Sequence, residues 1–232
     1  MNNGIRPGDV VSYMAMCSTE GVNLQRGMNF RLKKEYSVIL MSLRPGAPYA
    51  YRVEEDGRVL IYEGHDATKT RLGPDPKRID QPAWTPKGSP TQNKRFADAV
   101  EVYKTSGNAE TVKVYEKLRD GIWVYNGVFR LVDYWEEEFG GRKVYKFKLE
   151  VIEGREPQNV GSILDEEDRV IPSSVKLEVW TRDMGRCTKC GATSALHFDH
   201  IIPYSKGGSS KDSRNIQILC GRHNLEKHDR IE

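Results

Sequence analysis

In the first half of the chain, the pattern of hydrophobic and polar positions predicts β-strands. Residues 36–41 (YSVILM) form a β-prone apolar run. Two further runs, residues 51–53 and 58–62, flank Glu54-Glu55-Asp56-Gly57. An Asp-Gly pair between two such runs is a strong signal for a β-hairpin. The pattern therefore predicts a hairpin that follows an apolar strand.

The strand pattern continues as far as residue 151. Residues 121–151 predict strands on both sides of a Gly140-Gly141 turn, and residues 97–103 predict a helix. Residues 109–117 fit either a helix or a strand. The simplest architecture for residues 1–151 is a twisted sheet or a partly closed barrel with one or two helices.

This pattern stops at residues 152–173, which are acidic, have prolines at both ends and lack a sustained apolar period. Such a composition is typical of a linker or a loosely packed connector. Ser173 or Ser174 is then placed to cap a helix over residues 175–180. The expected fold class is α+β, with this linker between a domain at 1–151 and a second domain at 174–232.

The second domain predicts a strand, a loop and a short helix. Residues 196–201 (LHFDHI) predict the strand, residues 203–208 (PYSKGG) the loop, and the residues from Leu225 to the end the helix. Asn224 and His228 are four positions apart, so we expect them to share one helix face.

Four residues of the second domain have the spacing of a zinc site. Cys187 and Cys190 are separated by two residues, and Cys220 and His223 repeat that spacing. Three thiolates and one imidazole form a tetrahedral zinc set. The alternative is that these are ordinary buried cysteines of a reduced protein. Structural zinc is favoured, because so short a segment has little apolar core and gains folding energy from a metal.

The order of motifs in residues 174–232 resembles the HNH nucleases of the ββα-metal fold. The resemblance depends on four motifs: DHIIP at 199–203, KGG at 206–208, NIQILC at 215–220 and the ending C-x-x-H-N-x-x-K-H at 220–228. It implies an enzyme that hydrolyses phosphodiester bonds. That reaction needs an activated water, a cation at the phosphate oxygens and a fixed geometry.

The resemblance assigns roles to five residues. His200 is the candidate general base, because an imidazole titrates near neutral pH. Asp199 is a hard-oxygen ligand suited to a catalytic Mg²⁺ or Mn²⁺, and Asn224 and His228 complete that metal site. Asn215 orients the base.

Two other histidines leave alternatives open. The family's usual fourth cage ligand is a cysteine, so His223 either binds zinc or helps the catalytic metal, and its spacing favours zinc. His197 lies two positions before Asp199 on the same strand face. We expect His197 to be a surface or packing residue rather than a ligand, with a minor role at the site still open.

Composition limits the setting of the protein but not its target. The chain has 232 residues, of which 30% are charged, and its net charge of +3 says little about nucleic acids. No apolar run approaches membrane-spanning length, and the first residues lack the layout of a signal peptide. We expect a cytoplasmic, prokaryotic protein without a membrane partner, because a thiol-reducing compartment suits zinc thiolates.

Residues 66–92 interrupt the strand pattern with a proline-rich, basic stretch. A loop of this length inside a compact domain is usually functional or disordered. Two interpretations have equal weight: a mobile solvated loop, or a loop whose basic side chains line a phosphate backbone, namely Lys69, Arg71, Lys77, Arg78 and Lys87.

Several segments of residues 5–150 resemble landmarks of the SRA domain, a PUA-like barrel that flips and reads modified cytosine in DNA. They are residues 6–10 (RPGDV), 20–22 (EGV), 37–40 (SVIL), 62–66 (YEGHD) and 125–135 (YNGVFRLVDYW). Two positions depart from the family pattern. Asn126 replaces the aspartate of a Tyr-Asp-Gly sequence, and Asn23 stands where a histidine usually follows the valine.

The SRA resemblance also implies a pocket for the flipped base, in which aromatic rings above and below the base offset the lost stacking. Tyr62 matches the family's second aromatic residue. Tyr49 is the better candidate for the first, with Tyr51 close behind. No acid stands clearly where the family reads the Watson–Crick edge, so backbone groups or an acid of residues 54–56 serve instead, and we name Asp56. The alternative is that these tyrosines are ordinary sheet aromatics.

Together, the two resemblances imply a modification-dependent restriction endonuclease. Its partner is double-stranded DNA that contains 5-methylcytosine, with 5-hydroxymethylcytosine as an open alternative. Because one HNH site cuts one strand, a double-strand break suggests a homodimer or two molecules that meet on the DNA. Two other classes remain: an HNH nuclease whose first domain binds unmodified DNA, RNA or a partner protein, and a zinc-stabilised binding module without turnover.

Overall fold

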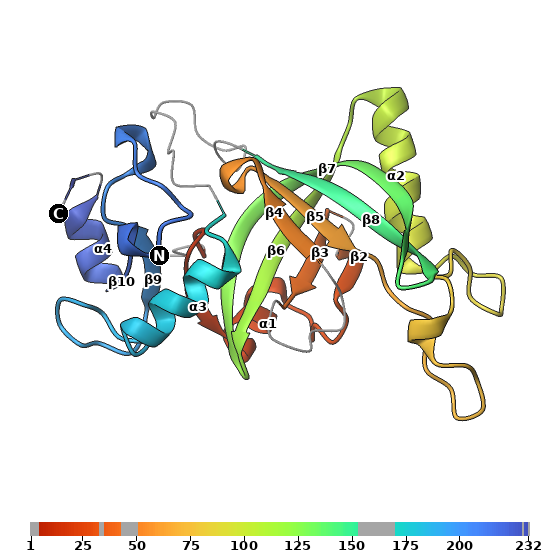
Figure 1. Cartoon of the computed structure of the whole chain (residues 1–232), viewed down its shortest axis with the longest axis horizontal. Coiled ribbons are helices and arrows are strands. Elements are labelled where there is room, and N and C mark those ends of the chain that lie inside the picture. Colours follow the sequence, from red (N-terminus) through yellow and green to blue (C-terminus); the bar gives the residue numbers. More distant parts are fainter. Residues whose placement is uncertain (1–4, 33–34, 43–50, 153–169, 229, 232) are drawn as a thin grey trace.

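The computed structural model describes residues 5–32, 35–42, 51–152, 170–228 and 230–231. Its larger part is one curved sheet with its helices, here called the sheet region, and a small ββα unit lies beside one end of it (Figure 1). The α+β fold class expected from the sequence is confirmed. Among the described helices, none combines the length and the hydropathy that a membrane span requires.

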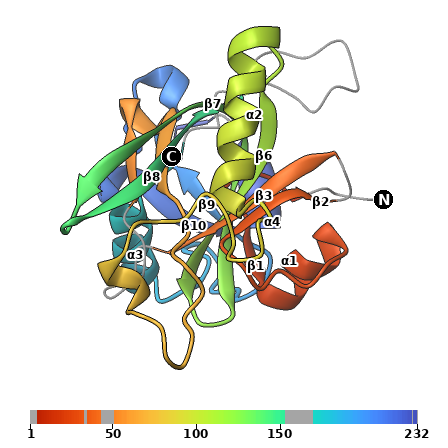
Figure 2. The same ribbon diagram turned by 90° about the vertical axis from the view of Figure 1, so that its right-hand side faces the viewer.

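The large sheet has eight strands in the described residues: β1 (Val10–Ser12), β2 (Met28–Leu32), β3 (Tyr36–Met41), β4 (Tyr51–Glu54), β5 (Val59–Glu63), β6 (Glu110–Arg119), β7 (Ile122–Phe139) and β8 (Arg142–Val151). Their order is β2-β3-β6-β7-β8-β5-β4, and β1 pairs with the first residues of β7. Only β3 and β6 run parallel in this set of pairs. Helix α1 (Tyr13–Glu20) follows β1, and helix α2 (Gln92–Ser106) packs against β2 and β7 (Figure 2).

The apolar runs of the sequence form the predicted strands. Residues 36–41 are β3, and β4 and β5 form the predicted hairpin, in which Tyr51 lies opposite Tyr62. The segment that fitted a helix or a strand is β6. Its inward side chains recur at every second position, as the period of a strand requires: Val112, Val114, Glu116 and Leu118. The predicted helix at 97–103 is confirmed as the middle of the longer α2.

The ββα unit contains α3 (Ser173–Arg182), β9 (Leu196–His200), β10 (Ile216–Cys220) and α4 (Gly221–Lys227). The predicted strand is confirmed as β9, which pairs antiparallel with β10. The helix expected from Leu225 onwards is wrong at both ends. It begins directly after Cys220 and ends at Lys227, because His228 has a φ of 52° that no helix continues. Asn224 and His228 therefore do not share a helix face.

Helix α3 begins without the serine cap that the sequence suggested. Ser173 is the first helical residue and Pro172 is the N-cap, which has no side chain able to accept a hydrogen bond. Most of the predicted linker, residues 153–169, lies outside the described residues. Its last residues are packed rather than loose, since the Val170 N–H donates to the Gly57 carbonyl at 3.1 Å. Gly57 has a φ of +92°, and a Cβ there would lie 2.4 Å from the Val170 carbonyl oxygen.

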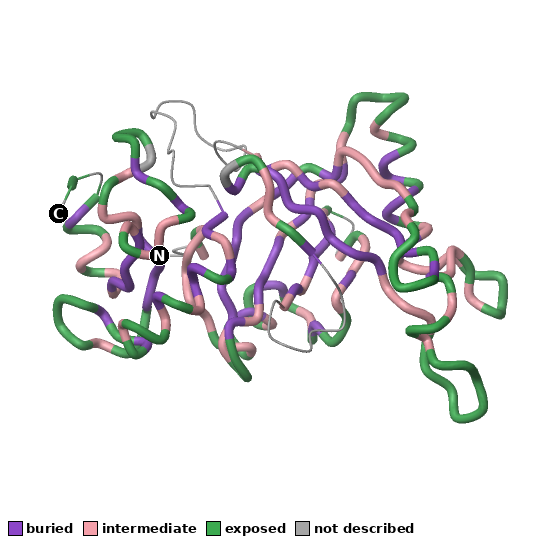
Figure 3. Tube along the Cα trace, viewed as in Figure 1, coloured by how far each residue is buried: buried purple, intermediate pink, exposed green. Residues whose placement is uncertain are grey.

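Two hydrophobic clusters pack the elements that carry the candidate functional residues. One lies between the curved sheet and α2 and contains Tyr51 and Tyr62. The other extends from β6 and β7 into the ββα unit: Leu118 and Val124 join Val175, Val179, Leu196, Phe198, Ile216, Ile218 and Leu219. Buried residues therefore continue from the strands into the small unit, while exposed residues gather on the loops (Figure 3).

Candidate functional site

The four predicted cage residues lie together in the ββα unit. Their ligand atoms are all within 4.8 Å of one another. Nδ1 of His223 is 3.3 Å from Sγ of Cys187 and 3.4 Å from Sγ of Cys220, and the Sγ atoms of Cys190 and Cys220 are 3.8 Å apart. Zn–S bonds of about 2.3 Å give a tetrahedron with S–S edges of about 3.8 Å. The donor set and its spacing fit one zinc ion.

The cage also has the electrostatics of a metal site. Burial raises the pKa of Cys187, but hydrogen bonds from the backbone at Cys220, Lys189 and Cys190 and from the His223 ring lower it to about 6. A thiol with this pKa is largely a thiolate at neutral pH, which is the form that binds zinc. His223 directs Nδ1 at the thiols, so its position favours the cage over the catalytic site.

The predicted catalytic carboxylate, Asp199, is buried between β10 and α4. It is 6% exposed, and Gln217 Nε2 donates to its Oδ2 at 3.1 Å. Nζ of Lys227 lies 3.2 Å from the same oxygen and donates to the carbonyl oxygen of His200 at 2.7 Å. Burial raises the pKa of Asp199, and Lys227 and Gln217 act against this shift. The structure therefore places a lysine ammonium beside the carboxylate.

These residues fit a hard divalent cation in part. A carboxylate has about four lone-pair sites, so Asp199 keeps acceptor capacity beyond Gln217 and Lys227. Asn224 lies three positions before Lys227 on α4, so the two residues share one side of that helix. His228 is exposed and lies beyond the end of α4. The chemistry of the donors suits Mg²⁺ or Mn²⁺ at Asp199 and Asn224 better than at His228.

The predicted general base, His200, is held in its neutral form. Burial is the largest cause that lowers its pKa, and together with the charges of Lys227 and His197 it brings the pKa to about 4. Its Nε2 is 2.9 Å from Oγ of Ser210, and within the described part of the chain no group bonds to its Nδ1. A neutral imidazole with one nitrogen available can accept a proton from water.

Asn215 contacts the loop after His200 rather than the imidazole itself. Its Oδ1 accepts from the Ile202 N–H at 2.8 Å, and its Nδ2 donates to the carbonyl oxygens of Ile202 and Ser209 at 3.1 and 3.2 Å. Gly208 packs so closely here that a Cβ would lie 1.8 Å from the Ile202 carbonyl oxygen. Asn215 can therefore orient His200 only indirectly, by fixing the loop that carries Ser210.

Three residues of this site were not predicted from the sequence: Gln217, Lys227 and Ser210. Lys227 stands three positions after Asn224 in the C-x-x-H-N-x-x-K-H ending, and that spacing was the available signal. Gln217 meets Asp199 because the two are opposite each other in the β9–β10 register. The sequence contains no comparable signal for Ser210, which lies in a loop with several polar residues.

His197, expected to be a surface or packing residue, packs against the sheet region. Its ring is buried, and its Nδ1 is 3.0 Å from Oδ1 of Asp9.

The residues named for the base pocket are only partly described. Tyr49 lies outside the described residues, as does the side chain of Asp56. Tyr51 and Tyr62 are cross-strand partners, 9% and 1% exposed. The Tyr62 hydroxyl donates to the Leu40 carbonyl at 3.2 Å, whereas the buried Tyr51 hydroxyl has no hydrogen-bond partner among the described atoms. Burial raises the pKa of Tyr51 strongly. Neither ring is open to solvent.

The proline-rich loop is fixed at its base by buried ion pairs. Arg142 Nη1 is 2.6 Å from Asp66 Oδ1, and Lys146 Nζ is 2.9 Å from Glu63 Oε2. Lys77 is paired with Asp66 at 2.7 Å, so its charge is partly compensated. The loop projects from one side of the sheet region (Figures 1 and 2). All five of the basic residues named for this loop are exposed: Lys69, Arg71, Lys77, Arg78 and Lys87.

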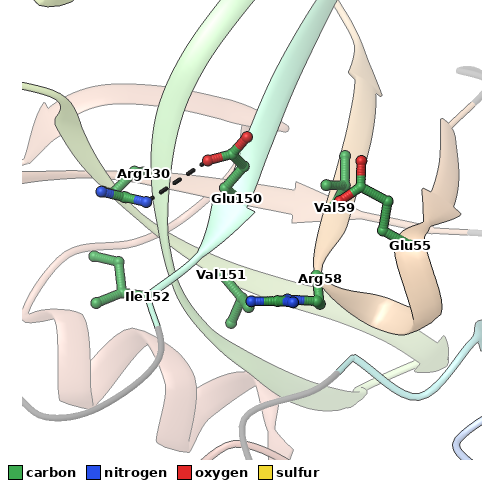
Figure 4. Close-up of a pocket in the computed structure, with 7 residues that line it drawn as sticks. All are labelled: Glu55, Arg58, Val59, Arg130, Glu150, Val151 and Ile152. Carbon is green, nitrogen blue, oxygen red and sulfur yellow. Dashed lines mark ion pairs between the residues drawn. The ribbon is translucent and has the colours of Figure 1, made fainter.

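A pocket of about 460 Å³ lies near the start of β5, the middle of β7 and the end of β8 (Figure 4). Two arginines and two glutamates line it, and Arg130 pairs with Glu150 at 3.6 Å; the lining residues are Glu55, Arg58, Val59, Arg130, Glu150, Val151 and Ile152. Its charges balance, and none of the predicted site residues belongs to it. We assign it no role in the chemistry.

Comparison with known proteins assigns families to both parts of the chain. The family model of the SAD/SRA domain matches residues 1–155, and the model of the HNH endonuclease matches residues 187–230. A search of curated proteins gives no match.

The chain is similar to several solved SRA structures. The SUVH5 SRA domain in complex with fully methylated CG DNA is 24% identical, with 67% of this chain and 95% of that chain covered and a TM-score of 0.46. The same domain bound to fully hydroxymethylated CG DNA is 23% identical, with 68% of this chain and 97% of that chain covered and a TM-score of 0.47. Arabidopsis thaliana SUVH6 in complex with SAM is 20% identical, with 66% of this chain and 26% of that chain covered and a TM-score of 0.40. Similarity this low carries no functional argument.

The two family matches occupy separate parts of one polypeptide, and the second coincides with the ββα unit and its cage. The chain belongs to the SAD/SRA domain family and carries an HNH endonuclease domain after it.

Proposed function

We propose that this chain is a modification-dependent DNA endonuclease. In this proposal the SAD/SRA domain binds duplex DNA at 5-methylcytosine or 5-hydroxymethylcytosine, and the HNH domain hydrolyses a phosphodiester bond nearby. The observation that supports it most directly is that Asp199 and His200 follow each other on β9 of a ββα unit with an assembled cage, in a chain that also belongs to the SAD/SRA family. We keep the boundaries 1–151, 152–173 and 174–232 as part of the proposal.

The chain's own residues would share the work of hydrolysis. His200 takes a proton from the attacking water through its available nitrogen, while Ser210 holds the other nitrogen at 2.9 Å. Asn215 fixes the loop that carries Ser210. A divalent Mg²⁺ or Mn²⁺ at Asp199 and Asn224 would stabilise negative charge on the phosphate oxygens. A zinc ion in the cage would be held by Cys187, Cys190, Cys220 and His223, and would fix the turn before β9 against the end of β10 and the start of α4.

The test is a digest of matched duplexes that differ only at one cytosine. The duplexes carry cytosine, 5-methylcytosine or 5-hydroxymethylcytosine, and each is incubated with Mg²⁺ and with Mn²⁺. We expect cutting of modified duplexes and little cutting of the unmodified one. Equal cutting of all three would leave a nuclease whose first domain has another target.

A second candidate is a zinc-stabilised DNA-binding module without turnover. The observation that favours it is the Lys227 ammonium 3.2 Å from Asp199, which already compensates the charge a catalytic cation would meet. The two candidates differ in their response to divalent ions. If neither Mg²⁺ nor Mn²⁺ produces cleavage of any duplex, while binding to modified DNA persists, the binding module is the correct function.

A homodimer is also part of the proposal, because one HNH site cuts one strand. It predicts that nicked duplex accumulates before the double-strand break at low protein concentration. A reaction whose ratio of nicked to broken product is independent of protein concentration would argue against it.

A further inference from the structure

A lysine of the ββα unit is buried inside the sheet region. Lys176 lies on α3 and is 1% exposed. Its Nζ donates to Glu116 Oε2 on β6 and to Asn126 Oδ1 on β7, both at 2.6 Å. Asn126 Nδ2 in turn donates to Glu116 Oε2 at 3.1 Å. The three side chains form a closed polar cluster with one positive charge, one negative charge and one neutral amide.

The identity of residue 126 matters for this cluster. An amide can accept from Lys176 and donate to Glu116 at the same time, whereas a carboxylate could only accept. A second carboxylate beside Glu116 would leave a net negative charge in a buried site, which is costly. With asparagine at position 126, where the SRA pattern has aspartate, the single lysine from α3 is sufficient to balance the charge of the cluster.

A second contact joins the two parts at the start of the chain. The segment of Gly8 and Asp9 lies between β7 and β9: the Gly8 N–H donates to the Tyr125 carbonyl at 2.8 Å, and the Gly8 carbonyl accepts from the Phe198 N–H at 3.1 Å. Asp9 also meets His197, at 3.0 Å. Gly8 has a φ of +91°, and a Cβ there would lie 2.9 Å from the His197 ring.

Both contacts are next to candidate functional residues. His197 and Phe198 directly precede Asp199 and His200 on β9. In the sheet region, burial is the largest cause that raises the pKa of Tyr51, and the charge of Glu116 is the next. The cluster of Lys176, Glu116 and Asn126 is therefore close to this candidate pocket residue. Leu118 and Val124 of the sheet region also belong to one buried apolar cluster with Val175 and Phe198. The two parts are thus joined by buried side chains on more than one element.

We propose that these contacts form a rigid joint that fixes the nuclease site relative to the base-reading region, so that cleavage falls at a defined distance from the modified cytosine. This inference rests on the proposed function. A tethered nuclease would sample many positions and cut over a range set by the tether. A nuclease held by Lys176 and by the Gly8–Asp9 segment has one position available.

The experiment maps cut positions on end-labelled duplexes that contain one 5-methylcytosine. The native chain is compared with the double variant Lys176→Met and Glu116→Gln, which removes both charges with little change in volume. A second variant, Asp9→Ala, removes the Asp9–His197 pair of the other contact, at a partly exposed position, and leaves the backbone bonds of Gly8 in place. We expect the native chain to cut at one or two phosphates per strand, and both variants to cut over a wider window while still preferring the modified duplex.

Lys113→Met is the matched control. Lys113 lies on β6 like Glu116, but its ion pair is with Glu20 of α1, inside the sheet region. It should leave the cut pattern unchanged. If both joint variants keep the native pattern, or if the native chain itself cuts over a wide window, the rigid joint is wrong.

A readout without cleavage separates this outcome from failure of the proposed function. Calorimetry should show one unfolding transition for the native chain and two for the Lys176→Met/Glu116→Gln variant, since uncoupled parts unfold separately. If modified DNA is not preferred but the transitions behave in this way, the joint stands and the function fails. Two transitions already in the native chain would overturn the joint whatever the enzyme cuts.

Discussion

The sheet region and the ββα unit are stabilised by different means. The sheet encloses large, fully buried side chains, among them Phe96, Phe129 and Phe147, and their contacts run between many strands. The ββα unit has two short strands, and its apolar residues belong to a cluster that it shares with β6 and β7. A segment of this size buries too little surface to fold alone and needs a metal or a neighbour.

The two regions differ in whether the same residues serve both stability and function. In the sheet region, the buried tyrosines, Tyr51 and Tyr62, are both core residues and candidate binding residues, so a substitution there confuses folding with binding. In the ββα unit, the cage and the pair of Asp199 and His200 are separate groups. Variants of this unit can therefore remove its fold or its chemistry one at a time.

The largest effect should follow removal of the cage metal. Cys187→Ser, or treatment with a strong zinc chelator, should disorder the ββα unit and abolish cleavage, because its short strands lose the cross-link between Cys187, Cys190, Cys220 and His223. Limited proteolysis should then remove the C-terminal part and leave the sheet region intact. Zinc content is measured in parallel.

Cys17→Ser is the matched control for this experiment. Cys17 is the one cysteine of the sequence that does not belong to the cage, and it lies on α1. It should retain full zinc content and full cleavage. Zinc binding that survives in Cys187→Ser and is lost in Cys17→Ser would contradict the assignment of the cage.

His200→Ala should remove chemistry without removing the fold. General-base catalysis typically contributes about 10²- to 10⁴-fold, so cleavage of the modified duplex should fall by that order. Zinc content, unfolding temperature and binding to modified DNA should remain close to native. A variant that retains more than a tenth of the native single-turnover rate would show that His200 is not the base.

Ser210→Ala should have a smaller effect on the same reaction. Loss of one hydrogen bond to the His200 ring costs about 1 kcal/mol, which corresponds to roughly five- to tenfold in rate. Ser209→Ala is the neighbouring control, since Asn215 contacts the Ser209 carbonyl and not its hydroxyl. Equal losses in the two variants would indicate a general effect on the loop instead of a role for Ser210.

The sequence predicted the elements better than the contacts between them. The apolar run of β3, the Asp-Gly hairpin of β4 and β5 and the strand β9 follow from local patterns, and all are present. Within each pair of cage residues the spacing is a property of a local turn, whereas the two pairs, 30 residues apart at Cys190 and Cys220, meet only in the folded unit. Local pattern is sufficient where neighbours in the sequence are neighbours in space.

The remaining features depend on pairing between distant segments. Gln217 meets Asp199 only through the β9–β10 register, and Lys227 of α4 meets Asp199 of β9 across 28 residues of the chain. Lys176 has the character of a surface lysine on a short helix, and its burial follows from Glu116, which is 60 residues away in the chain. No local period contains this information.

The smallest effect concerns pH and the sheet region, and leaves cleavage at neutral pH unchanged. Burial lowers the pKa of His65 to about 4, with Asp66 opposing and Arg26 adding to the shift, while the unfolded chain titrates near 6.5. Between these values the unfolded state binds more protons, so stability should fall as the pH decreases from about 6.5 to about 4, by at most about 1.4 kcal/mol per pH unit for this residue. Below pH 4 both states are protonated and this contribution stays constant. Denaturant unfolding of the native chain and of His65→Gln across this pH range measures the contribution. If the free energy of unfolding falls as steeply with decreasing pH in His65→Gln as in the native chain, His65 is not held neutral in the fold.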